Sequence, residues 1–294
     1  MADPRFAVVG IREPEPAAPE KRPRSAGKPL VSLWVLGLLL AGCLLCGLFL
    51  PGDPAYMDLT HCNTAPGQDF LFGTDAMGRD LFAMLWYGGR ISLAIGFAAA
   101  AVSTAIAMAV GTVSGLAPRW LDELIMRLTE LFLSIPSLLT VVLLQAVFGK
   151  ASVWTLSLVI GAAGWSAMAK VVRTEVLRLR SSEYMTAARC MGGGFIHNLR
   201  RHLAPNFFSS ILFMIVMNIR SAIVTESTLS FMGMGLPLEV ISWGSILSLS
   251  EKALLSGAWW VILFPGVFLI VTLLCVTNIG NYLRENADRR QSNL

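Results

Sequence analysis

The sequence predicts an all-α membrane protein with six transmembrane helices and both termini in the cytoplasm. Of its 294 residues, 55% are hydrophobic and only 14% are charged, whereas soluble domains carry about 25% charged residues. The mean hydropathy is +0.64, and the apolar residues form blocks close to the roughly 20 residues that a helix needs to cross a bilayer. Basic residues also gather on one side of these blocks, as they do in cytoplasmic loops.

Residues 1–29 are expected to form a disordered cytoplasmic tail. The segment contains six prolines and charges of both signs, so it cannot bury enough apolar surface to fold. Its basic end precedes the first apolar block, Leu30–Leu50, which is longer than the roughly 7–15 apolar residues of a secretory signal. We therefore interpret Leu30–Leu50 as an uncleaved first helix that begins in the cytoplasm.

Five further apolar blocks predict the remaining spans. They are Ile91–Leu116, Leu131–Phe148, Val153–Ala169, Phe207–Val224 and Trp259–Gly280. Seven basic and two acidic residues lie from Lys170 to Arg201, which marks this connection as cytoplasmic. The opposite side has few cations and carries acidic residues: Asp53, Asp58, Asp69, Asp75, Asp80, Glu239 and Glu251. The charges therefore agree with six spans in a membrane domain over residues 30–283, followed by a cytoplasmic tail over residues 284–294.

The connection over residues 51–90 is too polar to cross the membrane and is expected on the outer side. Its last part, FGTDAMGRDLFAMLWYGGRISL (72–93), leads into the second span with aromatic and charged residues. This composition predicts a helix lying at the membrane interface, with glycines that permit tight turns. His61 and Cys62, with Met57 nearby, offer only weak evidence for a soft-metal cluster.

The segment Leu121–Ser137 predicts an amphipathic start to the third span. Asp122, Glu123, Arg127 and Glu130 have spacings that allow pairing on one helix face. Pro136 can kink the helix. A role in gating and an ordinary charged helix end at the water boundary both fit this pattern.

Residues 183–206, EYMTAARCMGGGFIHNLRRHLAPN, form a polar and basic stretch between two apolar blocks. The pattern predicts a short helix to Met191, a turn at residues 192–194 and a second helix over Phe195–Leu203. The glycines allow the turn, and Pro205 follows where the second helix is expected to end. Such a projection suits docking of a soluble partner, although an ordinary basic cytoplasmic loop is the alternative.

Three polar residues, Asn218, Arg220 and Glu226, lie in or just after the fifth span. A charge at membrane depth is costly and normally faces a cavity or a partner. Arg220 and Glu226 are six residues apart, about 9 Å along a helix and on different faces, so they need not pair. Arg220 is expected either to face a polar path or a partner's carboxylate, or to snorkel towards the interface.

Several motifs resemble the permease subunits of ABC importers for dipeptides, oligopeptides and nickel, in particular the second permease of each importer. The family's cytoplasmic motif is matched by Ala187, Ala188, Gly192 and Pro205. Thr186 and Ala204 stand where the family usually has an acidic residue and a leucine. The outer motif G-T-D-x-x-G-R-D is matched by Gly73, Thr74, Asp75, Gly78, Arg79 and Asp80. A further motif matches Leu229–Gly244, and the resemblance covers about Leu30 to Arg289.

The resemblance implies a type I ABC-importer permease fold in the bacterial cytoplasmic membrane. The chain would be a non-catalytic subunit that binds no cofactor, because it has no phosphate-binding loop and separate ATPase chains would use ATP and Mg²⁺. The implied partners are a homologous second permease in a heterodimer, two ABC ATPases, an extracytoplasmic binding protein and membrane lipid, with no nucleic acid. The expected cargo is a dipeptide or oligopeptide, and nickel or a metal chelate is the alternative.

Roles in coupling and transport are expected for particular residues. Residues expected to couple the chain to its ATPase are Glu183, Ala187, Ala188, Arg189, Gly192, His202 and Pro205. Residues expected along the translocation path are Asn218, Arg220 and Glu226. No metal site is expected. A secondary transporter and a membrane-embedded enzyme are rival classes, but the spans lack the ion-coupling carboxylates and inverted repeats of the former and the catalytic groups of the latter.

Overall fold

The computed structural model describes residues 29–181, 204–237 and 239–292. Regular structure in these ranges is helical, apart from an isolated β-bridge between Thr74 and Asp80. A short 3₁₀ helix occupies Leu59–His61. The α-helices are α1 (Leu30–Phe49), α2 (Leu81–Leu116), α3 (Arg119–Ser134), α4 (Ser137–Phe148), α5 (Val153–Gly164), α6 (Ser166–Arg180), α9 (Ala204–Phe231), α10 (Trp243–Ser248), α11 (Ser250–Leu255) and α12 (Trp260–Ser292).

The described helices account for the predicted number of membrane spans. Four of them, α1, α2, α9 and α12, contain segments long and apolar enough to cross a membrane. Two bent pairs, α3 with α4 and α5 with α6, raise the number to six when each pair counts as one span. The all-α fold class is therefore confirmed, and the third and fourth spans are broken helices. The predicted tail over residues 1–29 lies outside the described residues except for Pro29.

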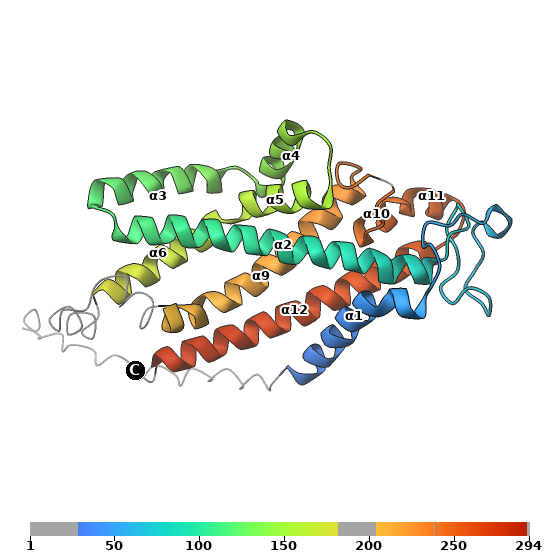
Figure 1. Ribbon diagram of the computed structural model, residues 1–294, viewed down its shortest axis with the longest axis horizontal. Coiled ribbons are helices and arrows are strands. Elements are labelled where there is room, and N and C mark those ends of the chain that lie inside the picture. Colours follow the sequence, from blue (N-terminus) through green and yellow to red (C-terminus); the bar gives the residue numbers. More distant parts are fainter. Residues whose placement is uncertain (1–28, 182–203, 238, 293–294) are drawn as a thin grey trace, which may run out of the picture.

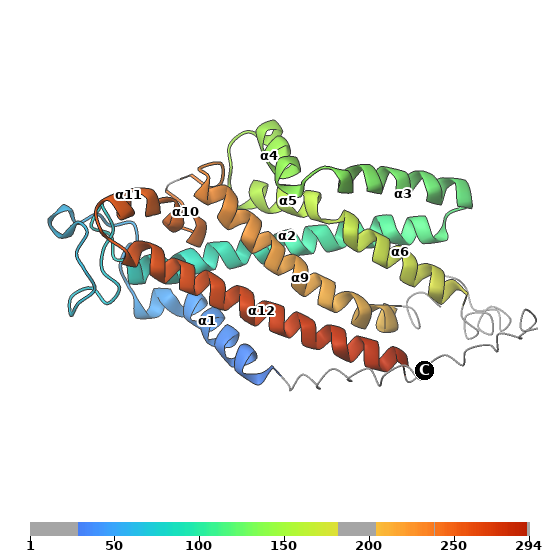
Figure 2. The same cartoon turned by 180° about the vertical axis from the view of Figure 1, so that it is seen from behind.

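The long helix α2 forms the centre of the bundle (Figure 1). It packs against α5, α6 and α9, while α12 packs against α9 and α1. Both views place α1 and α12 on one side of the bundle and α3, α4 and α5 on the other (Figures 1 and 2). One end carries residues 50–80 with α10 and α11, and the opposite end carries the end of α6, the start of α9 and the C-terminus. By the charge asymmetry, the first is the outer end and the second is the cytoplasmic end.

The second span begins ten residues before the predicted Ile91, because α2 runs without a break from Leu81. Residues 81–93 of the segment expected at the membrane interface are therefore the first turns of α2 itself. Asp80 caps the helix by accepting a hydrogen bond from the backbone N–H of Phe82 at 3.0 Å. Gly88 and Gly89 lie within α2 and do not form a turn. A Cβ on Gly89 would lie 2.5 Å from Cys43 Sγ, so a larger residue would not fit there. Both glycines allow close helix packing within a membrane.

Pro136 breaks the third span. Proline has no N–H for a helical hydrogen bond and excludes the residue before it from helical geometry. Ile135 accordingly has an extended conformation, with φ −88° and ψ 129°. The axes of α3 and α4 differ by 94°, whereas α5 and α6 differ by only 51°. The predicted kink is thus confirmed as a complete change of direction.

Helix α9 is longer than the predicted fifth span and includes the outer segment up to Phe231. Pro205 lies in its first turn, where a missing N–H costs nothing. The short helix that Pro205 was expected to follow, Phe195–Leu203, lies outside the described residues. The sixth helix, α12, is likewise longer than predicted and continues to Ser292.

Candidate functional site

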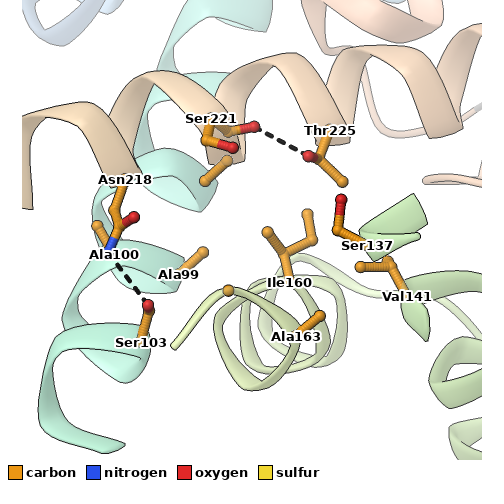
Figure 3. Close-up of a pocket in the computed structure, with 12 residues that line it drawn as sticks. Ala99, Ala100, Ser103, Ser137, Val141, Ile160, Ala163, Asn218, Ser221 and Thr225 are labelled. Atoms are coloured by element: carbon orange, nitrogen blue, oxygen red, sulfur yellow. Dashed lines mark hydrogen bonds between the residues drawn. The ribbon is translucent and has the colours of Figure 1, made fainter. Parts of the chain in front are cut away.

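A polar cavity of about 70 Å³ lies between four helices of the bundle (Figure 3). Residues from α2, α4, α5 and α9 line it, and Asn218 lies near the middle of α9. Its polar lining consists of Ser103, Ser137, Asn218, Ser221 and Thr225. Small residues, including Ala99, Ala163 and Gly164, leave the remaining space. The volume is enough for a few water molecules, since one water needs about 10–15 Å³ of such space.

Hydrogen bonds fix two of these polar groups. The Asn218 amide donates from Nδ2 to Ser103 Oγ at 3.2 Å and lies 3.5 Å from the sulfur of Met168. The Thr225 hydroxyl donates to the backbone carbonyl of Ser221 at 2.9 Å (Figure 3). No charged side chain is among the described residues that line the cavity. The site therefore presents neutral amide and hydroxyl groups, which both donate and accept hydrogen bonds.

The break at Pro136 places α4 at this cavity. Ser137 and Val141 come from the first turns of α4, and both line the space below α9. If α4 continued along the axis of α3, Ser137 and Val141 would not face this cavity. The sequence predicted the kink at Pro136. It did not predict that Ser103, Ser137, Ser221 and Thr225 would line a cavity. The available signal was the helical spacing of Asn218, Ser221, Ala222 and Thr225, which places four small or polar residues on one face.

The three residues predicted for the translocation path lie in different surroundings. Asn218 lines the cavity, whereas Arg220 is exposed on another face of α9. Glu226 is completely buried at the outer end of α9 and lies outside the cavity lining. Four serine hydroxyls donate hydrogen bonds to its carboxylate. The structure thus separates three side chains that the sequence grouped together.

The outer motif, residues 73–80, forms a tightly hydrogen-bonded turn between the first connection and the starts of α2 and α12. We refer to this turn as the corner. Asp75 Oδ1 accepts hydrogen bonds from the backbone N–H groups of Met77 and Arg79, both at 2.9 Å. Its Oδ2 pairs with the Arg79 guanidinium at 2.7 Å, and both side chains are buried. Gly78 has φ +72°, and a Cβ there would lie 1.8 Å from the carbonyl oxygen of Asp58. Only glycine fits this position.

Thr74 and Asp80 join this corner to the helices. The Trp260 indole donates to the Thr74 carbonyl at 2.9 Å, which attaches the start of α12 to the corner. Gly73 adopts φ +76° directly beside the Trp260 ring. Burial raises the pKa of Asp80, while the backbone N–H groups of α2 act in the opposite direction. We conclude that the six motif residues shape the outer end of the bundle.

The neighbouring 3₁₀ helix contributes an exposed polar cluster. Asp58 accepts hydrogen bonds from the backbone and side chain of Thr60 and contacts His61 Nδ1 at 2.7 Å. These hydrogen bonds lower the pKa of Asp58 to about 2. His61 and Cys62 do not belong to a larger ligand set, because the described residues contain no group of three His, Cys, Asp or Glu suited to a metal ion.

At the cytoplasmic end, the charges of α3 contact α6. Arg173 holds Asp122 with two hydrogen bonds of 2.5 Å, and Ser114 also donates to Asp122. Lys170 contacts Glu130 at 3.2 Å. Of the four charges whose spacing allows pairing on one face, Asp122 and Glu130 have their partners on α6, whereas Glu123 pairs within α3 with Arg119 at 2.9 Å. The ion pairs of Asp122 and Glu130 attach the amphipathic α3 to the span that leads towards residues 182–203.

Most of the predicted coupling residues lie outside the described residues. They are Glu183, Ala187, Ala188, Arg189, Gly192 and His202. The helices on either side are described: α6 ends at Arg180 and α9 begins at Ala204, both at the cytoplasmic end (Figures 1 and 2).

A bundle of up to six membrane spans with a polar cavity between its helices is the architecture of a multi-pass membrane protein. Residues 107–293 match the family model described as the binding-protein-dependent transport system inner membrane component. The chain belongs to this family.

Known relatives cover nearly the whole chain. A Brucella suis protein whose name describes a peptide permease is 36% identical over 262 residues, which span 89% of this chain and 86% of the relative. The oligopeptide transport system permease protein OppC of Bacillus subtilis is 34% identical over 90% of this chain and 86% of its own length. The dipeptide transport system permease protein DppC of the same organism is 32% identical, over 88% of this chain and 81% of its own length.

Proposed function

We propose that this chain is the permease subunit of an ATP-driven ABC importer that moves dipeptides or oligopeptides across the bacterial cytoplasmic membrane. The family membership supports the transport role, and the names of the relatives support a peptide cargo. The chain acts as a channel-forming subunit and performs no chemistry on the cargo. The observation that carries the proposal is the uncharged, hydroxyl-lined cavity around Asn218.

The chemistry of this cavity matches a peptide backbone. Peptide amides need partners that both donate and accept hydrogen bonds, as Asn218, Ser221 and Thr225 do. A neutral lining also forms no ion pair with a charged peptide, so peptides of either charge can pass without being held there. Nickel, by contrast, favours imidazole and other nitrogen or sulfur ligands. Among the described lining residues there is no His, Cys or Met, and the Asn218 amide is the one side-chain nitrogen. The nickel alternative therefore has no support from this site.

The positions of α6 and α9 support a coupling loop over residues 183–206. Both helices reach the cytoplasmic end where this segment begins and finishes. From there α9 leads directly to Asn218, and α6 leads through the bend at Trp165 to α5, which lines the opposite wall. A displacement of the loop would therefore reach two walls of the cavity at once.

The remaining partners follow from this role. Two ABC ATPases that use ATP and Mg²⁺ would push the coupling loop, and an extracytoplasmic binding protein would deliver the cargo at the outer end. A homologous second permease would complete the path, since the isolated chain leaves an apolar face of α3 and α4 exposed. Its exposed side chains include Trp120, Leu124, Leu128, Leu131, Leu139 and Leu143. Lipid would cover the part of this face that the second permease leaves free.

Uptake into proteoliposomes tests the proposal. The full complex, purified with the permease and ATPase chains encoded beside it, is supplied with its binding protein and either a labelled dipeptide or labelled Ni²⁺. We expect dipeptide uptake that requires ATP inside the vesicle and no uptake of Ni²⁺. Uptake of Ni²⁺ alone would assign the metal cargo, and uptake without ATP would assign a secondary transporter.

A further inference from the structure

Glu226 has an unusual environment for an acidic residue within a membrane helix. It is 0% exposed, and each carboxylate oxygen receives two hydroxyl groups. Oε1 accepts from Ser242 at 2.7 Å and from Ser230 at 3.0 Å. Oε2 accepts from Ser92 at 3.0 Å and from Ser227 at 3.3 Å. The described ion pairs do not include Glu226, so the hydroxyls are its stabilising partners.

Three of these hydroxyls also accept backbone N–H groups. Ser92 Oγ accepts the N–H of Trp243 at 3.1 Å, and Ser242 Oγ accepts the N–H of Ser245 at 3.0 Å. Ser230 Oγ is likewise 3.5 Å from the N–H of Leu236. Each of these hydroxyls can accept from the backbone and still donate its own proton to Glu226. A carboxyl oxygen that accepts two hydroxyl protons uses both of its lone pairs.

The ring of hydroxyls joins three separate elements. Ser92 belongs to α2, Ser242 precedes α10, and the other two serines belong to α9 together with Glu226. Next to the ring, Trp243 is completely buried and its indole donates to the Leu85 carbonyl at 2.9 Å. We refer to α10 and α11, Trp243–Leu255, as the outer cap. The ring and Trp243 attach the start of this cap to the outer ends of α2 and α9.

Close backbone packing supports this attachment. A Cβ on Gly244 would lie 2.7 Å from Ser227 Cα, and one on Gly235 would lie 2.5 Å from Ser230 Cα. The cap and the turn before it therefore pack closely on α9, against the backbone of Ser227 and Ser230 and the small side chain of Ser230. This close packing and the hydrogen bonds of Glu226 attach the cap to the same turn of α9.

The anchored part of α9 also lines the cavity. Thr225 precedes Glu226 directly, and Asn218 lies about 12 Å away along the same unbroken helix. A change in the position of the cap would therefore move Asn218 and Thr225 relative to α5. The outer cap itself is at the end of the bundle that faces away from the cytoplasm (Figure 1).

We propose that Glu226 is a positioning residue for transport. It holds the outer cap on α9 so that contact of an extracytoplasmic binding protein with the outer end is transmitted to the cavity. The inference rests on the proposed function, because it needs a binding protein that stimulates the ATPases. It replaces the expectation that Glu226 contacts the cargo.

The test compares the basal and binding-protein-stimulated ATPase rates of the complete complex in lipid nanodiscs. The Glu226→Gln variant keeps the shape but turns an NH₂ group towards hydroxyl donors. We expect the stimulated rate to fall about tenfold, because the two hydroxyls that donate to the replaced oxygen both face an NH₂ group and lose their acceptor. The basal rate is expected to stay within about twofold, since Glu226 does not touch the ATPase end. Ser227→Ala, which removes the longest contact, is the matched control and should keep the stimulation.

A second pair of variants covers the case in which Glu226→Gln fails to assemble. Ser92→Ala removes one donor to Glu226 and the acceptor for the Trp243 N–H, and Ser92→Thr restores the hydroxyl. We expect Ser92→Ala to lose stimulation and Ser92→Thr to regain it. An equal loss of basal and stimulated rates, or no rescue by threonine, would overturn the proposal. An unmodified complex that takes up no peptide and shows no stimulation would instead overturn the proposed function.

Discussion

Asn218 combines a polar side chain with a position near the middle of a membrane helix, so its substitution tests the cavity directly. Asn218→Leu removes the amide that donates to Ser103 and adds apolar bulk to the site. We expect peptide uptake to fall about tenfold, the effect of losing one or two hydrogen bonds to the cargo. Proteoliposome uptake at saturating binding protein measures this.

Thr228→Val on the same helix is the control for Asn218→Leu. Within the described part of the chain, the Thr228 hydroxyl donates to the carbonyl of Val224 in its own helix, and Thr228 is not among the lining residues. Uptake by this variant should match that of the unmodified chain. Equal uptake by Asn218→Leu would remove Asn218 from the path.

Individual side chains were predictable where a local rule applied. The turns at Gly73 and Gly78 follow from the glycines in the sequence of the outer connection, and both residues have positive φ in the structure. The environment of Glu226 could not be predicted from a local pattern, because its partner Ser92 is 134 residues away in the sequence. A buried acid requires donors, but the sequence does not say which hydroxyls the fold brings to it. The same reason explains why Ser103 was missed as the partner of Asn218.

The contact between α3 and α6 depends on one partly buried ion pair. The Asp122 side chain is only 13% exposed and the Arg173 side chain 28%. Arg173→Met leaves Asp122 without its charged partner, and we expect the free energy of unfolding to fall by about 2 kcal/mol. Thermal unfolding of the detergent-solubilised chain measures the change.

The pair Arg119–Glu123 on α3 provides the control for this measurement. Both side chains are exposed, 93% and 62%, and an exposed pair contributes about 0–1 kcal/mol. Arg119→Met should therefore leave the unfolding temperature almost unchanged. A similar loss in both variants would show that charge on α3 matters more than the contact with α6.

The bend at Pro136 is the feature of the helices that most directly shapes the cavity. Pro136→Ala restores a backbone N–H and releases Ile135 for helical geometry. We expect the 94° angle between α3 and α4 to open, so that Ser137 leaves the cavity and uptake falls. Spin labels at Leu128 and Leu143, both exposed, should report a longer distance than in the unmodified chain. An unchanged distance would assign the bend to packing alone.

Helices were predictable in number and less so in extent. Hydropathy located the four continuous spans because each has a long, predominantly apolar run, which in α9 is interrupted only at polar positions such as Asn218 and Arg220. It placed the start of α2 ten residues late, since Gly88 and Gly89 resemble a turn in the sequence but pack against Trp243 and Ser242 in the structure. The packing of Gly88 and Gly89 against neighbouring elements, and not their local sequence, determines that α2 is continuous there.

The complete bundle connects its two ends through the cavity. From the cytoplasmic end, α9 and the bent pair α6–α5 lead to opposite walls of the cavity. At the outer end, the cap and the corner around Asp75 attach to α9, α2 and α12. The cavity around Asn218 thus lies between the cytoplasmic end and the outer end of the same set of helices, as the proposed transport role requires.

The coupling loop can be tested only in the assembled complex. Ala188→Arg places a long side chain where the resemblance requires a small one for close approach of an ATPase. We expect the tagged permease to lose its ATPase subunits on purification, because a bulky residue at a packed interface costs about 1–3 kcal/mol. Ala65→Glu, an exposed position at the outer end, is the control and should keep them. Retention of the ATPase by Ala188→Arg together with its loss in Ala65→Glu would reverse the orientation assigned to the bundle, since the motor would then contact the end that carries α10 and α11.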